Sequence, residues 1–295
     1  MIPQGLAPAP ASAPARPVWQ RRSVTVGDGL ALAVFTTGRT DSAAPTIVFV
    51  HGMGHWTQAA WDFVAAELAA THRIVAFDLP GFGDSAKPNV AYSLPFFTAT
   101  LHGLVETLKL ERFALVGHSL GGLIAASYAA AYPQRIRLLG LVDPAGFLRT
   151  PKLVLKIAGS RPITWLFGKI RPSRGFVRRT FTSAVFDAAT IPDDYHERAF
   201  ALSQDHTMTR AFASVYANSM RAFLSIDALH ARLGQYAGPV LIVWGRDDRF
   251  VPIAGLATAR RVYPQADVLE IADCGHCPNM ERPDVVAARL IASGA

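Results

Sequence analysis

Cysteine and charge are both scarce in this sequence of 295 residues. Its two cysteines, Cys274 and Cys277, are too few for a disulfide framework. They bracket His276, but two thiols and one imidazole at this spacing match no zinc signature, and a tetrahedral site would need further ligands. We therefore interpret both thiols as packing residues. Charged residues make up 17% and hydrophobic residues 51%, so a large buried core is expected and global disorder is excluded.

Long apolar runs and internal repeats are also missing. No stretch offers about 18 uninterrupted apolar residues, so a membrane-spanning helix is not expected. Residues 1–17 are rich in Ala and Pro and lack the basic start and apolar run of a secretory signal. We expect a disordered tail there and a cytoplasmic protein. The lack of a fixed repeat period excludes solenoids and propellers.

The remaining sequence alternates short apolar runs with segments of helical periodicity, which is typical of a largely parallel sheet with crossover helices. A hairpin is predicted around Gly27-Asp28-Gly29, between strands at 24–26 and 30–36. The other predicted strands are 46–50, 73–77, 113–116, 138–142, 239–244 and 267–271. The predicted helices are 59–70, 96–108, 120–131, 253–262 and 283–292.

This alternation stops after about Pro144 and resumes near Gly238. The stretch between them has helical periodicity and no convincing strand. We therefore predict an α/β core formed by residues 18–145 and 229–295, with residues 146–228 as a helical cap. The cap should cover the carboxyl edge of the sheet, where α/β proteins bind their ligands.

The clearest chemical signal is Gly117-His118-Ser119-Leu120-Gly121, which lies between a predicted strand and a predicted helix. This is the G-x-S-x-G nucleophile elbow in the context it requires. The glycines are needed because side chains on either side of so tight a turn would collide with neighbouring backbone. The pattern predicts Ser119 as a nucleophile.

A serine hydroxyl needs a base within hydrogen-bonding reach. His276 is the best candidate, since it lies in a loop between the last predicted strand and the last predicted helix. His118 is constrained inside the elbow. We expect the other histidines outside the strand exits to be surface or insertion residues: His72, His102, His196, His206 and His230.

The base in turn needs an acid that holds its tautomer. Three aspartates compete for this role. Asp248 and Asp247 follow the strand at 239–244, which gives the chain order serine, aspartate, histidine. Asp143, at the end of an earlier strand, is the third candidate. We favour Asp248 and interpret Asp247 as a turn or salt-bridge residue.

Acyl transfer also requires hydrogen-bond donors where negative charge develops. His51-Gly52-Met53-Gly54 directly follows the strand at 46–50. A loop there would offer the backbone N–H of Met53, and the helix after the elbow would offer that of Leu120. The alternative is a simple glycine-rich strand exit.

Together these motifs resemble the α/β-hydrolase superfamily, as does the segment Phe77-Asp78-Leu79-Pro80-Gly81-Phe82-Gly83-Asp84-Ser85. The resemblance implies an eight-stranded, mostly parallel sheet with helices on both faces, a helical cap, and hydrolysis without metal or cofactor. It places the acid on Asp248. The segment 244–252 is especially similar to hydrolases that cleave carbon–carbon bonds in ring-cleavage products.

Since relatives that open epoxides or remove halides use an aspartate nucleophile, Ser119 excludes those subclasses. The sequence predicts a serine hydrolase, a carboxylesterase or lipase of apolar acyl esters by an acyl-enzyme mechanism. The alternatives are a carbon–carbon bond hydrolase, an acyl-thioester or acyl-carrier esterase, and a slow-turnover ligand receptor. Substrate contacts are predicted from His55, Trp56, His118 and Phe147.

The net charge of +7 is concentrated in one region, because residues 145–182 contain nine basic side chains and no acidic one. Three interpretations remain open: a solvated cap face, docking of an acidic partner or anionic substrate, and contact with a membrane surface. Nucleic acid is not expected, since no reading motif accompanies the charge. The basic residues are Arg149, Lys152, Lys156, Arg161, Lys169, Arg171, Arg174, Arg178 and Arg179.

Overall fold

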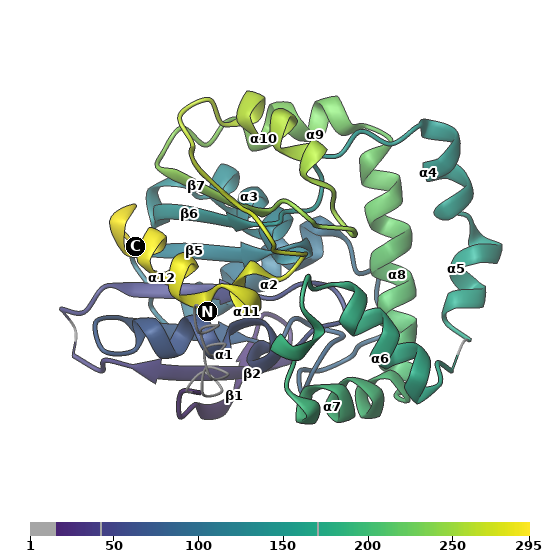
Figure 1. The fold of residues 1–295 in the computed structure, drawn as a ribbon, viewed down its shortest axis with the longest axis horizontal. Helices are drawn as coiled ribbons and strands as arrows, with labels where there is room; N and C mark the ends of the chain where they lie inside the picture. Colours follow the sequence, from purple (N-terminus) through teal and green to yellow (C-terminus); the bar gives the residue numbers. More distant parts are fainter. Residues whose placement is uncertain (1–15, 42, 170) are drawn as a thin grey trace, which may run out of the picture.

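The computed structural model describes residues 16–41, 43–169 and 171–295. Its centre is an eight-stranded sheet with the order β1-β2-β4-β3-β5-β6-β7-β8 (Figure 1). Strand β2 runs antiparallel to β1 and β4, and all other neighbours are parallel. The strands are Gln20–Val26, Leu30–Gly38, Thr46–Val50, Arg73–Phe77, Phe113–His118, Ile136–Val142, Val240–Gly245 and Asp267–Ile271, numbered β1 to β8.

The central strands are apolar on both faces because helices cover both faces. Along β3, Val48 and Val50 pack into the cluster under α2 and α3, whereas Ile47 and Phe49 pack into the cluster under α1 and α12. This is the two-residue period of a strand. The core helices are α1 (Thr57–Leu68), α2 (Leu94–Thr107), α3 (Leu120–Ala131), α10 (Leu256–Val262), α11 (Pro278–Glu281) and α12 (Pro283–Ala292).

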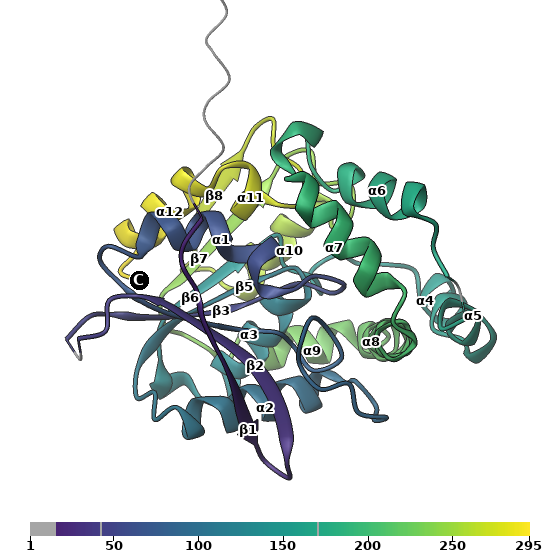
Figure 2. The same cartoon turned by 90° about the horizontal axis from the view of Figure 1, so that it is seen from below.

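Between β6 and β7 the described chain is helical and contains no strand. Five helices form a layer that we call the cap, and Figure 2 shows it standing beside the sheet. Helices α7 and α8 pack against the core, while α4 and α5 are outermost. The cap helices are α4 (Lys152–Ala158), α5 (Arg161–Phe167), α6 (Arg174–Ser183), α7 (Asp193–Ser203) and α8 (His206–Phe223).

Helix α9 (Ile226–Leu233) follows the cap and packs back on α3, with Leu229 and Leu233 in the core. The predicted boundary between residues 228 and 229 therefore falls inside one helix. Of the predicted tail, residues 1–15 lie outside the described residues. Arg16 forms a bidentate ion pair with Asp194 of α7, at 2.7 and 2.8 Å.

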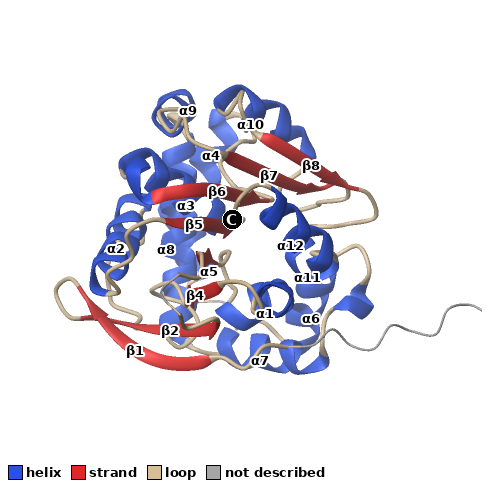
Figure 3. Cartoon of the chain, turned by 90° about the vertical axis from the view of Figure 1, so that its left-hand side faces the viewer, coloured by secondary structure: helices blue, strands red, loops and turns tan. Residues whose placement is uncertain are grey.

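The predicted fold class is confirmed, with helices on both sides of the sheet (Figure 3). The short helix α11, in a segment of mixed polarity, was not predicted. Within the described residues, no helix has both the length and the apolar character needed to cross a bilayer.

Candidate active site

Ser119 lies in the sharp turn between β5 and α3, with backbone angles φ 53° and ψ −118°. A left-handed φ is strained for a serine and holds only where the surroundings fix it. The flanking glycines explain how the turn fits. A Cβ on Gly117 would lie 2.2 Å from the Gly121 carbonyl oxygen, and one on Gly121 would lie 2.2 Å from that of Val50. The elbow predicted from the sequence is thus sterically specified.

The structure brings His276 and Asp248 together. Asp248 Oδ2 lies 2.7 Å from His276 Nδ1, and both side chains are buried. Asp248 Oδ1 accepts the backbone N–H groups of Phe250 and Val251, at 2.7 and 2.9 Å. Three hydrogen bonds therefore orient the carboxylate, while neighbouring Asp247 is exposed. This arrangement keeps the proton on Nδ1 and leaves Nε2 as the base.

The loop that carries His276 lies against the elbow. The His276 carbonyl oxygen accepts a hydrogen bond from His118 Nε2 at 2.6 Å, and the two rings are 4.8 Å apart. Burial, with the nearby His276, lowers the pKa of His118 well below its ordinary value. No hydrogen bond joins Ser119 Oγ to His276 in the described chain. Such contacts are often long without substrate.

Asp143, at the end of β6, lies beside this pair. Its Oδ1 accepts the N–H of Gly245 at 3.0 Å, and its ligand atoms lie within 4.8 Å of those of Asp248 and His276. Burial, reinforced by the charge of Asp248, raises the pKa of Asp143 well above its ordinary value. The site therefore favours the neutral form of the Asp143 carboxyl group.

Asp143, Asp248 and His276 are also the one group among the described residues whose atoms are spaced for a metal ion. Since Asp248 and His276 are joined directly at 2.7 Å, no ion fits between them. The two cysteines are buried and unpaired, and burial raises the pKa of both thiols. Their positions agree with packing residues.

Met53, in the loop after β3, and Leu120, at the start of α3, are the residues predicted to supply oxyanion donors. The backbone N–H groups of Met53 and Leu120 have no acceptor among the described residues. A Cβ on Gly52 would lie 3.2 Å from Ser119 Cβ, so a larger residue there would push this loop and the elbow slightly apart. Buried His51 accepts the N–H of Leu79 at Nε2, 2.8 Å away, and its Nδ1 lies 2.7 Å from the Gly52 carbonyl oxygen.

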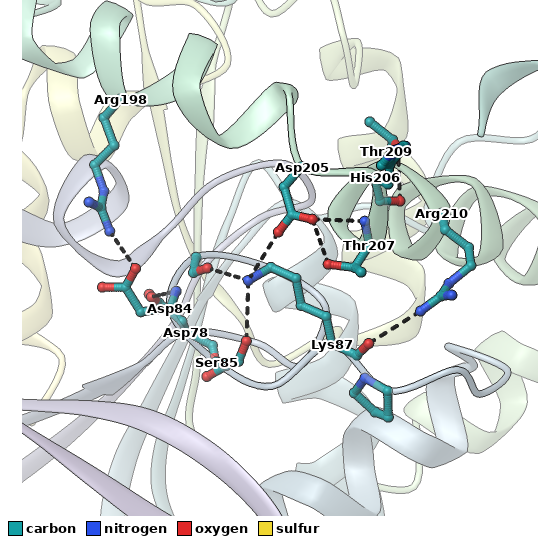
Figure 4. A network of polar contacts seen from close by, with 12 residues as sticks. Asp78, Asp84, Ser85, Lys87, Arg198, Asp205, His206, Thr207, Thr209 and Arg210 are labelled. Carbon is teal, nitrogen blue, oxygen red and sulfur yellow. Dashed lines mark hydrogen bonds and ion pairs between the residues drawn. The ribbon is translucent and has the colours of Figure 1, made fainter. Parts of the chain in front are cut away.

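A second loop, residues 78–87, joins the core to the cap (Figure 4). Asp78 accepts the N–H groups of Thr57 and Asp84, at 2.7 and 2.8 Å. Asp84 pairs with Arg198 of α7 at 3.0 Å. Lys87 donates to the Gly83 carbonyl at 2.8 Å and pairs with Asp205 at the start of α8 at 3.6 Å. This network fixes two cap helices to the glycine-rich motif noted in the sequence.

The loop bearing His276 is also fastened to the cap. The His276 N–H donates to the Ala184 carbonyl at 2.6 Å. The Glu281 carboxylate accepts from Gly275 N–H at 2.9 Å and from Phe186 N–H at 2.7 Å. Glu281 was not predicted, because nothing in the sequence links it to residues almost a hundred positions earlier.

A cavity of about 360 Å³ lies within the cap and reaches the loop after β3 at Gly54. Phe181 from its wall stacks on His55 with ring centres 5.4 Å apart, and His55 lies 5.6 Å from His118. Apolar side chains dominate, and no cationic side chain lines the described cavity. Its lining is Gly54, Pro172, Phe176, Val177, Thr180, Phe181, Ala199, Ser203, Met208, Thr209 and Phe212.

The four predicted substrate contacts have different positions. His118 belongs to the elbow, and His55 lies between the His118 ring and Phe181 of the cavity wall. Burial lowers the pKa of His55 to about 3. Trp56 is buried behind Phe181, 6.1 Å away, rather than in the lining. Phe147 lies in the core, stacked on His230 at 5.7 Å, so this prediction needs correction. The cavity lining from α6 to α8 does not follow from the sequence, because cap periodicity does not reveal which face lines a cavity.

Comparisons with known proteins agree with this geometry. A family model described as the alpha/beta hydrolase fold matches residues 45–283. A 2-hydroxy-6-oxononadienedioate/2-hydroxy-6-oxononatrienedioate hydrolase of Cupriavidus pinatubonensis is 31% identical over 88% of this chain and 90% of its own length.

Two solved structures are also similar. One is described as a membrane phospholipase A and a novel bacterial virulence factor. It has a TM-score of 0.75 and 27% identity, over 93% of this chain and 85% of that one. The other, a putative lipase from Acinetobacter baumannii, has a TM-score of 0.79 and 24% identity, over 93% and 90%. The second likeness is one of fold.

Proposed function

The chain belongs to the α/β-hydrolase family, and from that premise we propose that it hydrolyses carboxylic esters of apolar acids through an acyl-enzyme on Ser119. The observation that carries the proposal is the apolar cavity that reaches the loop after β3. The described lining of this cavity contains no cationic side chain. Its volume of about 360 Å³ suits one acyl chain or a small ring.

In the proposed mechanism, His276 Nε2 takes the Ser119 proton as Oγ attacks the ester carbonyl. The oxyanion accepts hydrogen bonds from the Met53 and Leu120 N–H groups, and Asp248 stabilises the imidazolium. His276 then protonates the departing alcohol, and the acyl group remains bonded to Ser119 Oγ as the acyl-enzyme. A water molecule, deprotonated by His276, attacks the acyl carbonyl, and the acid leaves as Ser119 regains its proton.

Carbon–carbon bond hydrolysis is the second candidate. The Cupriavidus pinatubonensis relative, at 31% identity, is named for such a substrate class. Its named substrates are dioates, whose carboxylates would be buried in the cavity without a cationic partner. Because burying an unpaired charge is costly, the cavity favours the ester. The structure described as a phospholipase A also supports the ester, since that name denotes an enzyme acting on lipid esters.

The test compares p-nitrophenyl esters of increasing acyl length with a 2-hydroxy-6-oxo-dienoate. We expect measurable turnover of the esters, with an optimum at the length that fills the cavity. Ser119→Ala should reduce kcat by about 10⁶-fold, the cost of removing a serine nucleophile. The matched control is Ser127→Ala, a buried serine on α3, the helix that follows Ser119, and it should keep full activity.

If Ser119→Ala hydrolysed the esters at the wild-type rate, Ser119 would not be the nucleophile. A higher kcat/KM for the dienoate than for every ester would establish the second candidate. A single stoichiometric turnover with retention of the acid would instead indicate a ligand receptor.

A further inference from the structure

The outer surface of the cap exposes an unusual number of apolar side chains. Leu153 is 69% exposed and Ile157 54% on α4, and Trp165 is 65% exposed on α5. Val154 and Leu166 are exposed beside them. Figures 1 and 2 both place α4 and α5 at the edge of the molecule, with α8 between them and the sheet. We call these five side chains the α4–α5 face.

The orientation of α4 explains this exposure. Leu155 is buried toward α8, and a Cβ on Gly159 would lie 2.9 Å from Met220 Cβ of α8. Side chains four residues apart share a helix face. Leu153 and Ile157 therefore lie together on the side of α4 turned away from α8. The helix buries one apolar residue inward and presents others outward.

Cations without carboxylate partners occur on the same two helices as the α4–α5 face. Elsewhere in the basic segment, Arg149 pairs with Asp227, Arg174 with Glu197, and Arg178 with Asp193. On α4 and α5 themselves, no ion pair to another described residue is made by Lys152, Lys156 or Arg161. Lys169 Nζ lies 5.8 Å from the centre of the Trp165 ring.

We propose that the α4–α5 face binds the surface of an anionic lipid bilayer. Its apolar side chains would enter the headgroup region, while the flanking lysines and Arg161 contact lipid phosphates. Charge complementarity favours this occupant, since residues 145–182 contain no acidic side chain. An acidic protein or nucleic acid would use the charge but leave the aliphatic side chains without a partner. The proposal goes beyond ester hydrolysis and does not depend on it.

The experiment measures co-flotation of full-length Ser119→Ala protein with vesicles, so that lipid hydrolysis cannot alter the result. One vesicle is phosphatidylcholine alone, and the other is equal parts phosphatidylcholine and phosphatidylglycerol. We expect binding to the anionic vesicles only, weakening with salt. Lys152→Gln with Lys156→Gln should lower the partition coefficient about 25-fold, since a basic residue near such a surface contributes roughly fivefold.

Leu153→Ser with Ile157→Ser should lower the partition coefficient at least tenfold. The matched control is Ile291→Ser on α12, whose side chain is similarly exposed at 50%. This variant should bind like the parent protein. Leu153, Ile157 and Ile291 are all exposed, so circular dichroism should show that both variants are folded.

Fluorescence provides a second measurement. Brominated phosphatidylglycerol should quench part of the tryptophan emission, and Trp165→Phe should remove that quenching while binding persists. The proposal is wrong if anionic vesicles bind no better than neutral ones, or if the Leu153 and Ile157 variant binds like the parent. Binding that requires only the lysines would indicate a charge-only contact, such as an acidic protein makes, and would also overturn it.

Discussion

Asp143→Asn provides the most direct test of the carboxyl pair at the candidate site. Burial and the Asp248 charge both raise the pKa of Asp143 well above its ordinary value, which favours its neutral form. An asparagine has the same shape and no charge. Its amide oxygen would still accept the Gly245 N–H, and its NH₂ group would take the position that faces Asp248. The substitution therefore replaces one neutral group with another.

The magnitude follows from proton linkage. Unfolded aspartate has a pKa of about 3.9, so the wild type must take up a proton on folding above that pH. A raised folded pKa makes wild-type stability fall as pH increases, by about 1.4 kcal/mol per unit. The loss continues until the folded pKa is reached. The amide that replaces the carboxyl cannot titrate, so the Asp143→Asn protein should gain stability over wild type by that amount per pH unit.

Urea unfolding of both proteins at several pH values between about 5 and 8 measures this difference. This range lies above the unfolded aspartate pKa of about 3.9. The activity assay is its companion. Asp143→Asn should keep kcat within about threefold, whereas Asp248→Asn should lose about 10⁴-fold because the base adopts the wrong tautomer. Exposed Asp247→Asn is the control for both measurements. A stability difference that does not change with pH, or a kcat loss as large as that of Asp248→Asn, would refute the assignment.

Three further predictions concern the surroundings of the site. Glu281→Gln keeps only one acceptor oxygen for the Gly275 loop and the cap, so kcat should fall about tenfold with little change in KM; an unchanged kcat would contradict this. Gly121→Ala should cost more than about 3 kcal/mol of unfolding free energy, because its Cβ would clash with a strand carbonyl at 2.2 Å. Gly175→Ala, with open space around it, is its control in the same urea titration. Ala199→Leu narrows the cavity and should move the acyl-length optimum to shorter esters, with no shift if the chain binds elsewhere.

Much of the core could be predicted from the sequence. Strands β3 and β4 were predicted with the bounds observed, since each is an apolar run that ends at polar residues or turns. The same holds for α3, which begins directly after the elbow. In these segments the local pattern and the tertiary environment require the same residues.

The cavity could not be predicted in this way. Gly54, Phe181 and Phe212 meet only through packing of the cap on the core, and nothing in their spacing along the chain indicates it. Phe147 illustrates the same limit from the other side. An aromatic residue just after a strand has the same sequence signal whether it lines a cavity or, as here, fills the core.

The attachment of the His276 loop to the cap links the position of the cap to the position of His276. Residues 184–186 contribute a carbonyl to the His276 N–H and an N–H to Glu281. If this segment moved to admit a substrate, the His276 N–H would lose its Ala184 acceptor and Glu281 would lose its Phe186 donor. The 2.7 Å contact between His276 and Asp248 lies outside this attachment, so the cap would affect the position of the loop more than the pairing of the two side chains.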